Sequence, residues 1–327
     1  MSIRYIGTPT HVARESFPGK ILAEIRREFG AEVEPFTLHL PVPELLAGVW
    51  MACRETLLAD NGRRDAKEVV ATAISELNQC PYCVDAHSMM ILSSAGSDYP
   101  DALNDPYLSA VAAWASATRN SDSPLLRKPP FPRQEAPAFI GTAVVFHYIN
   151  RMVSILLGSS PLPFTQGLPK KIAMQLAAWF FGGAVRREKE PGKSLDLLPD
   201  CPLPNDLLWA KPSRPIAGAF ARFAQAVENA GSEALSPEVR RAVSKAARRW
   251  NGVDPGMNTM WCDEAIVPLG EMDKCAGRLA FYTAFAPYRV NEGIVKEFSD
   301  RFPGDKNLIS ALAWSSFTAA RRIGSWL

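Results

Sequence analysis

The sequence lacks an excess of charge of either sign. Its 36 Lys and Arg residues stand against 34 Asp and Glu, which leaves a formal net charge of +2 over 327 residues. A protein that is held on a phosphate backbone or an acidic membrane surface by electrostatics needs a basic excess. We therefore expect neither nucleic acid nor a membrane as the partner.

Long uninterrupted apolar runs are also missing. A membrane-spanning helix needs roughly 20 apolar residues, and the run over residues 172–185 is shorter. The segment 139–157 is long enough but carries His147, Asn150 and Arg151 near its middle, where hydrocarbon would penalise them. Both segments predict buried helices. The first residues show no basic cluster followed by an apolar run, so we expect no secretory signal and a cytoplasmic protein.

Cysteine is scarce, with six residues in the whole chain, and this argues against the disulfide framework of a secreted protein. An isolated cysteine is most often a small buried apolar residue. Four of the six are isolated in this way: Cys53, Cys201, Cys262 and Cys275. Only Cys80 and Cys83 form a local group.

Alternating apolar and polar positions, which indicate strands, are lacking as well. Apolar residues instead recur at steps of three and four, the period of a helix with one buried face. We therefore expect an all-α protein. The pattern predicts helices over residues 45–58, 66–77, 108–118, 137–157, 170–185, 216–230, 237–250, 269–285 and 307–323.

Prolines concentrate in the segments 121–137 and 191–215, through which no continuous helix can run. The chain is also longer than one hydrophobic core usually spans. We therefore predict a helical domain over residues 1–190, a proline-rich linker over 191–215 and a second helical unit over 216–327.

The two halves contain similar short stretches. Residues 46–50 resemble residues 216–220, and residues 109–114 resemble residues 310–314. These echoes predict two related helical units. The second unit lacks a cysteine pair, because Cys262 stands alone.

The most informative segment contains Glu68, Cys80, Cys83 and His87. Pro81 suits the first position of a helix, which puts Cys80 near the N-cap. Positions three and four apart project from one face of a helix, so the two thiols and the imidazole are expected to meet. Glu68 lies on the preceding predicted helix, and antiparallel packing of the two helices would bring its carboxylate to the imidazole.

This arrangement suits thiol redox chemistry. A free thiol with a pKa near ~8.5 is mostly protonated at neutral pH. The positive end of a helix and a nearby histidine both favour the thiolate. A second cysteine one turn away can attack the first oxidation product and release it as an intramolecular disulfide. The carboxylate of Glu68 can orient the imidazole in a proton relay.

Other interpretations of the same residues remain open. Glu68 can pair with Asp65 as a capping box at the start of the helix. Cys80, Cys83 and His87 can be three ligands of a structural zinc, although the usual fourth ligand and a second CxxC are missing. A thioredoxin fold needs a β-strand that leads into the first cysteine of the pair. The apolar residues before Cys80 recur with a helical period instead, so we do not expect this fold.

The apolar helix predicted over residues 137–157 carries a polar stripe formed by His147, Asn150, Arg151 and Ser154. We favour an interior hydrogen-bond network or an oligomer contact for this stripe. The alternative places His147 in the wall of a pocket beside the cysteines. His11 and His39 have no expected partners.

The order of Glu68, eleven residues, Cys80, two residues, Cys83, three residues and His87 resembles the active-site pattern of one family. It is similar to that of the alkylhydroperoxidase AhpD-like group within the carboxymuconolactone decarboxylase superfamily. The flanking stretches 67–75, 85–87 and 141–153 also resemble this group.

The resemblance implies an AhpD-like helical fold, a homo-oligomer and a thiol peroxidase that reduces organic hydroperoxides without metal or other cofactor. It assigns peroxide attack to Cys83, resolution to Cys80 and a proton relay to His87 and Glu68. It also implies a dithiol reductant, of which a lipoyl-type protein is an example. Tyr82, expected beside the pocket, stands where the best-known members carry a histidine.

The sequence therefore predicts a thiol-dependent peroxidase as the function. Two alternatives stay open. The first is a redox-sensing or disulfide-exchange protein with little peroxidase turnover. The second is a helical scaffold whose cysteines hold a structural zinc.

Overall fold

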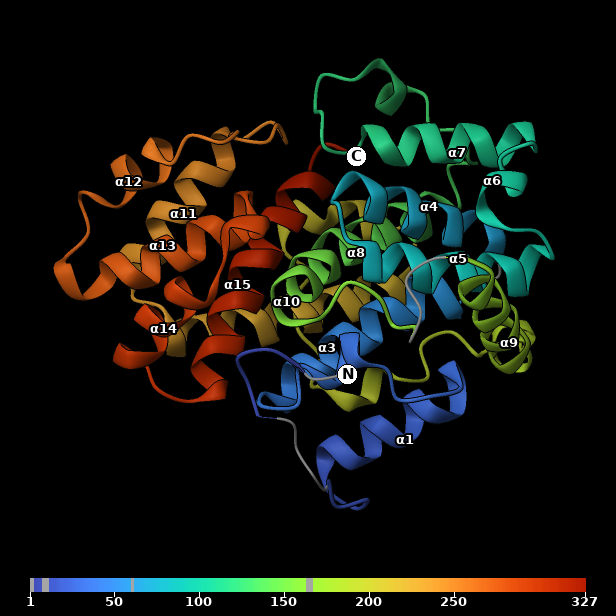
Figure 1. The fold of residues 1–327 in the computed structure, drawn as a ribbon, viewed down its shortest axis with the longest axis horizontal. Helices are drawn as coiled ribbons and strands as arrows, with labels where there is room; N and C mark the ends of the chain where they lie inside the picture. Colours follow the sequence, from blue (N-terminus) through green and yellow to red (C-terminus); the bar gives the residue numbers. More distant parts are fainter. Residues whose placement is uncertain (1–2, 8–11, 60–61, 163–166) are drawn as a thin grey trace.

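A computed structural model describes residues 3–7, 12–59, 62–162 and 167–327 (Figure 1). Helices joined by turns and loops make up this part of the chain, and none of these residues forms a strand. The all-α prediction is confirmed.

The first half contains nine α-helices and two short turns of other helical types among its described residues. The α-helices are α1 (Phe17–Phe29), α2 (Glu34–Thr37), α3 (Pro43–Cys53), α4 (Arg64–Leu77), α5 (Pro81–Ala95), α6 (Tyr99–Ala102), α7 (Pro106–Ala117), α8 (Ala136–Leu156) and α9 (Gly167–Arg186). A π-helical turn, η1 (Arg54–Leu58), follows α3, and a 3-10 turn, η2 (Pro124–Arg127), follows α7.

The second half begins with two 3-10 turns, η3 (Leu195–Leu197) and η4 (Asn205–Ala210). Its α-helices are α10 (Arg214–Ala234), α11 (Pro237–Arg249), α12 (Met260–Ile266), α13 (Glu271–Phe285), α14 (Glu292–Arg301) and α15 (Asp305–Gly324). A last 3-10 turn, η5 (Pro287–Arg289), lies between α13 and α14.

Local sequence signals set many of the helix starts. Proline occupies the first helical position of α3, α5, α7 and α11, where its missing N–H costs nothing. The side chains of Ser16, Asp105 and Ser236 accept hydrogen bonds from backbone N–H groups in the first turns that they precede. These caps fix where the chain enters α1, α7 and α11.

The capping box expected at the start of α4 is not formed. The helix begins at Arg64, so Asp65 lies inside the first turn, and no side chain caps this end. The carboxylate of Glu68 instead binds Arg64 and His87. The spacing of the two acidic residues suits a capping box, but the Glu68 carboxylate binds Arg64 one turn earlier in the same helix and His87 of α5.

Helix α8 runs through the middle of the molecule, beside α15 (Figure 1). Among the described helices it alone is long and apolar enough to cross a membrane, and 94% of its most apolar stretch is buried inside the protein. This is the environment of a core helix, as the polar residues in its sequence predicted.

The two halves share one hydrophobic core. Buried side chains form a continuous cluster from Ile6 to Ala320, with α3 packed on α10 and α8 packed on α15. At the first contact, a Cβ atom on Gly48 would lie 2.7 Å from Phe223 Cδ2, so only glycine allows this approach. The predicted relatedness of the two units stays a prediction.

The proline-rich segment between the halves is packed against the first half. The carboxylate of Glu55 accepts hydrogen bonds from the backbone N–H of Gly192 at 2.7 Å and from Ser194 Oγ at 3.2 Å. Leu207 and Ala210, in η4, are fully buried. The segment is therefore held against the core at these residues, while most of its other residues are exposed or half-buried.

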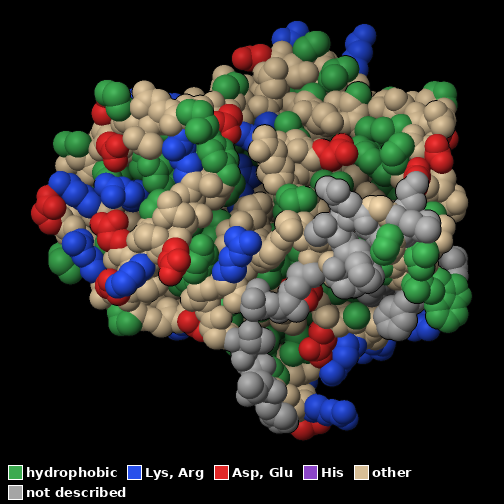
Figure 2. Space-filling model, in the orientation of Figure 1, with side chains coloured by type: hydrophobic (Ala, Val, Ile, Leu, Met, Phe, Trp, Pro, Cys, Tyr) green, Lys and Arg blue, Asp and Glu red, His purple; other side chains and the backbone are tan. Residues whose placement is uncertain are grey.

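Figure 2 shows one face of the molecule, on which blue and red side chains alternate over α11 to α14. This mixture agrees with the near-neutral net charge of the chain. No broad field of one sign covers the described part of this face.

Candidate active site

The turn between α4 and α5 places Cys80 at the start of a helix. Gln79 adopts a left-handed backbone conformation with φ of 53°, which turns the chain sharply after α4. The backbone N–H of Cys80 then donates to Ser75 O at 2.9 Å. Cys80 is the N-cap of α5 and Pro81 is its first residue, as the sequence predicted.

The two cysteine sulfurs lie together, as expected for residues one helical turn apart. Cys80 Sγ and Cys83 Sγ are 3.0 Å apart, which is hydrogen-bond distance for thiols. Both residues are free thiols and are almost completely buried, with 1% and 2% of their surfaces exposed. This separation leaves little movement to make before a disulfide can form.

The two thiols do not hold their protons equally. Burial raises the pKa of both, but at Cys80 contacts with Cys83 and with the Ser154 side chain outweigh burial and lower the pKa. The pKa of Cys83 is raised, first by burial and then by neighbouring Cys80, while Asn150 opposes this rise. Because the two sulfurs are in contact, they ionise as one coupled pair.

A buried carboxylate holds the imidazole of His87. His87 Nδ1 lies 2.6 Å from Glu68 Oε2, and Arg64 Nε donates to Glu68 Oε1 at 2.7 Å. Burial alone would raise the pKa of Glu68, but Arg64 and His87 outweigh it and lower the pKa. Glu68 is therefore a fixed anion that binds Nδ1 of His87. The other ring nitrogen, Nε2, lies on the opposite side of the ring.

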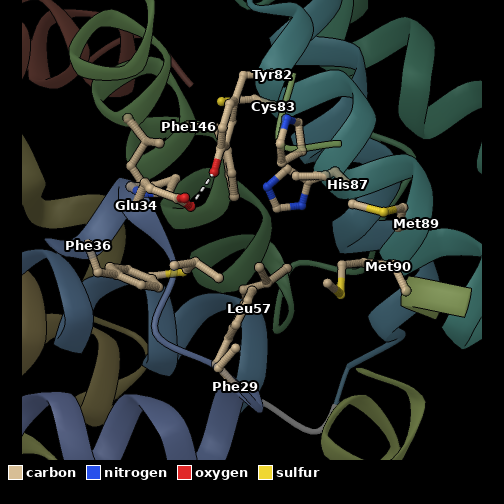
Figure 3. A pocket seen from close by; sticks show the side chains of 18 of the residues that line it. Phe29, Glu34, Phe36, Leu57, Tyr82, Cys83, His87, Met89, Met90 and Phe146 are labelled. Atoms are coloured by element: carbon tan, nitrogen blue, oxygen red, sulfur yellow. Dashed lines mark hydrogen bonds between the residues drawn. The ribbon is translucent and has the colours of Figure 1, made fainter. Parts of the chain in front are cut away.

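Cys83 and His87 line the same pocket (Figure 3). This cavity has a volume of about 300 Å³. Its wall is mostly apolar and comes from α1, α2, α3, η1, α5, α8, α9 and neighbouring loops, with Phe36, Leu57, Met89, Met90 and Phe146 among the contributors. The ring of Phe146 packs edge-on against His87, at 4.4 Å between ring centres.

Tyr82 lies in the wall of this pocket, as expected. Its hydroxyl donates to Glu34 Oε2 at 2.8 Å (Figure 3). Burial, followed by the charge of Glu34, raises the pKa of Tyr82, so the hydroxyl keeps its proton. No sequence pattern predicted the Glu34 contact, because Glu34 belongs to a four-residue helix 48 positions away in the chain.

Cys80 lines a different hollow, of about 530 Å³. Polar and acidic residues surround it there, including Ser75, Glu76, Gln79 and Asp85. The two sulfurs are in mutual contact, yet each one belongs to the wall of a separate hollow.

The polar stripe on α8 forms an interior hydrogen-bond network, the interpretation that we favoured. His147 Nδ1 lies 3.1 Å from Asn78 Nδ2, and His147 Nε2 lies 2.8 Å from Thr118 Oγ1. Asn78 also donates to Asn150 Oδ1 at 2.9 Å, and Asn150 Nδ2 donates to Ser75 Oγ at 3.1 Å.

His147 itself is fully buried and is not among the described residues that line the pocket. Burial, then the charges of Arg151 and Arg119, hold its pKa well below the usual value. The alternative that placed His147 in the pocket wall therefore does not match its position. Its environment is that of a neutral interior histidine.

Two residues of this stripe touch the cysteines, which the sequence patterns did not reveal. Asn150 contacts Cys83 and Ser154 contacts Cys80, and each lowers the pKa of its partner thiol. The clue was present in the spacing, since both residues share a face of α8 with His147. What was missing was the knowledge that this face packs on the start of α5.

The remaining histidines differ in outcome. His39, for which no partner was expected, is fully buried and its Nε2 lies 2.7 Å from the hydroxyl of Tyr148. His11 lies outside the described residues.

As to metal binding, no cluster of three or more His, Cys, Asp or Glu side chains within the described ranges is arranged to hold an ion. Of the three ligands considered for a structural zinc, His87 has its Nδ1 engaged by Glu68.

The fold and this site define a class: all-helical proteins with a CxxC thiol pair at a helix start and a buried His–Glu pair beside it. Comparison with known proteins agrees. The chain is 36% identical over 321 residues to a protein of Mycobacterium tuberculosis named alkyl hydroperoxide reductase, covering 94% of this chain and 90% of the relative. No family model matches the sequence. The chain belongs to the AhpD-like alkyl hydroperoxide reductase family.

Proposed function

We propose that the protein is a thiol-dependent peroxidase that reduces organic hydroperoxides through Cys83 and Cys80. One observation carries this proposal: Cys83 and His87 open on one apolar pocket while Cys80 lies 3.0 Å from Cys83. The name of the M. tuberculosis relative supports the same activity.

The first step forms the nucleophile. His87 accepts one proton from the thiol pair, and Glu68 stabilises the imidazolium that results. The two sulfurs, 3.0 Å apart, share the negative charge that remains and exchange the remaining proton, because a coupled pair ionises as a unit.

The second step reduces the peroxide. Cys83 Sγ attacks the outer oxygen of the hydroperoxide while its proton passes across 3.0 Å to Cys80. The O–O bond breaks, Cys83 becomes a sulfenic acid, and the alkoxide takes the proton from His87 and leaves as the alcohol. Cys80 Sγ then attacks Cys83 Sγ, and the hydroxyl departs with the Cys80 proton as water.

The third step returns the disulfide to thiols. We propose that a dithiol reductant reaches Cys80 from the 530 Å³ hollow, on a different side from the hydroperoxide. Its thiolate attacks Cys80 Sγ, Cys83 leaves as a thiolate, and the second thiol of the reductant releases Cys80. Separate entrances let the oxidant and the reductant act without displacing each other.

The test is turnover of cumene hydroperoxide with a dithiol such as dihydrolipoamide. We expect Cys83→Ser and Cys80→Ser to lose turnover, while Cys201→Ser keeps it, because Cys201 lies outside both hollows. Activity that survives Cys83→Ser would refute the proposal.

The order of the two cysteines is tested separately. In the Cys80→Ser variant, peroxide should leave a sulfenic acid on Cys83 that dimedone labels and mass spectrometry locates. In the Cys83→Ser variant, the Cys80 thiolate should attack the oxidised, disulfide form of the dithiol, such as lipoamide, and form a mixed disulfide at Cys80 while one thiol of the probe is released. If peroxide and dimedone label Cys80 in this variant and leave Cys83 unlabelled in the Cys80→Ser variant, the assignment is reversed.

A disulfide-exchange protein is the second candidate. The lowered pKa of Cys80 and its place in a hollow of its own favour exchange with another thiol. Rapid exchange with dithiols, together with no measurable consumption of hydroperoxide, would select this function over the peroxidase.

A further inference from the structure

We propose that Glu34, held in place by Tyr82, makes the pocket selective for neutral apolar hydroperoxides and unfavourable to those that carry a carboxylate. This inference rests on the proposed peroxidase function. It concerns the substrate class, and it assigns a specificity role to a residue of α2 that takes no part in the chemical steps.

The position of Glu34 is well defined. Helix α2 is preceded by an extended residue and has Pro35 in its first turn. The carboxylate accepts the Tyr82 hydroxyl at 2.8 Å, and Tyr82 is 3% exposed. Figure 3 shows the pair at one side of the cavity, with His87 across from it. A buried phenol therefore fixes the carboxylate at the pocket.

Among the described residues of the pocket wall, no Lys or Arg matches the charge of Glu34. Of the described residues that line the cavity, two are carboxylates, Glu32 and Glu34, and none is Lys or Arg. Glu32 forms an ion pair with Arg26 at 2.8 Å. The partner of Glu34 is the neutral hydroxyl of Tyr82, so its charge acts on whatever enters.

The rest of the described wall offers an anionic ligand little compensation. Apart from Tyr82, Cys83 and His87, it is built mainly from apolar side chains such as Leu57 and Met90. The thiol pair becomes negative when it is activated, and the proton that it loses makes His87 a cation in the same pocket. These two charges offset each other, so the charge of Glu34 remains as the excess. A carboxylate in such a site loses hydration without gaining a partner, whereas a neutral aryl or alkyl group gains apolar contacts.

Two hydroperoxides of nearly equal size provide the kinetic test. We compare kcat/KM for cumene hydroperoxide with kcat/KM for its 4-carboxylate derivative, at low ionic strength. We expect the neutral compound to be favoured by about tenfold or more, as for like charges several ångströms apart in a partly buried site. Glu34→Gln should reduce this ratio several-fold.

Glu32→Gln is the matched control. It removes the same charge from the same pocket wall, but from a residue paired with Arg26. We expect it to change the ratio much less than Glu34→Gln does. Equal effects of the two variants, or a ratio near one in the unaltered protein, would overturn the inference.

A binding measurement separates this inference from the proposed function. Cumyl alcohol and its 4-carboxylate derivative, the corresponding products, are titrated against the reduced protein by calorimetry. Tighter binding of the neutral alcohol that depends on Glu34 supports the inference even if no peroxide is turned over. Equal binding of the two alcohols overturns it even if the peroxidase reaction is found.

Discussion

A single buried carboxylate shows how the site controls protons. Glu68 is fully buried, yet its pKa is lowered, because Arg64 and His87 outweigh the effect of burial. A buried negative charge is stable only when nearby positive charges or hydrogen-bond donors compensate for its lost hydration, and Arg64 and His87 do so here. Arg64 is thus a positioning residue, since it touches the carboxylate and not the reacting sulfurs.

We expect Arg64→Met to raise the pKa of Glu68 and to move the acidic limb of the pH profile of kcat/KM upward by about one unit or more. The reason is that protonated Glu68 can no longer stabilise the imidazolium of His87. Arg63→Met is the control, because Arg63 pairs with Asp65 nearer the surface. An unchanged acidic limb in the Arg64 variant would show that Glu68 does not need this partner.

Asn150 has a comparable role next to Cys83. It is 1% exposed, bonds Asn78 and Ser75, and lowers the pKa of Cys83. We expect Asn150→Leu to destabilise the protein by about 2 kcal/mol, because buried polar partners lose their bonds, and to raise the pKa of Cys83. Chemical denaturation and the pH dependence of cysteine alkylation measure the two effects.

Ile155→Leu on the same helix is the control for Asn150→Leu. This substitution conserves side-chain volume at a site that is 1% exposed, so the free energy of unfolding should fall by less than about 1.5 kcal/mol. If Asn150→Leu leaves cysteine alkylation unchanged, the residue serves only the packing of α8.

The residues of the site were predictable to different degrees. Spacing along one helix was enough to group Cys80, Cys83 and His87, since their contacts follow from the helical period. Glu68 needed one further assumption, the packing of two consecutive helices. Glu34 could not be predicted, because its contact depends on tertiary packing across 48 positions of the chain.

Among the elements, helix length explains only part of what could be predicted. Several long helices lie within a few residues of their expected bounds, for example α8 at 136–156 against an expected 137–157. The sequence analysis missed α1, although this helix has 13 residues. Helices α2 and α6 have four residues each and a proline in the first turn, too few residues to show a helical period.

Contact between α10 and α15 depends on a glycine. A Cβ atom on Gly231 would lie 2.1 Å from Trp314 Cδ1 and 2.4 Å from Cγ, and Trp314 is 3% exposed. We expect Gly231→Ala to destabilise the protein by about 1–3 kcal/mol, because a buried indole ring cannot yield without moving a helix. Urea denaturation followed by circular dichroism measures the change.

Gly183 in α9 offers the opposite case. No atom of the described residues lies within 4 Å of its Cβ position, so Gly183→Ala should stabilise the protein by about 0.5–1 kcal/mol through helix propensity. If Gly231→Ala and Gly183→Ala change the free energy of unfolding in the same direction, close packing at Gly231 does not determine the effect of the first substitution.

At the scale of the whole molecule, the shared core makes the two halves depend on each other. Helices α3 and α8 bury their inner faces against α10 and α15 of the second half. We therefore expect the chain to unfold as a unit, as smaller domains with one core do, although its sequence predicts two units joined by a linker. The expected association of several copies stays a prediction.

This common core also determines how stability depends on pH. His39 is fully buried against Tyr148, and burial lowers its pKa from 6.5 to about 4. Between these values the unfolded chain binds a proton that the folded protein does not, so stability falls as the pH is lowered from 6.5 towards 4. The contribution of His39 over this range is about 3 kcal/mol, and His147 acts in the same direction.

Urea denaturation at pH 7 and at pH 4.5, monitored by tryptophan fluorescence and by circular dichroism, tests two expectations. The first is that the two halves unfold together, and the second is that His39 lowers the stability in acid. We expect the two probes to report one coincident transition at each pH, with a lower free energy of unfolding at pH 4.5. His39→Gln should reduce the difference between the two pH values, because glutamine does not titrate and can still bond Tyr148. Separate transitions for the two probes would mean that the halves unfold independently, and an equal pH difference in the variant would remove His39 from the explanation.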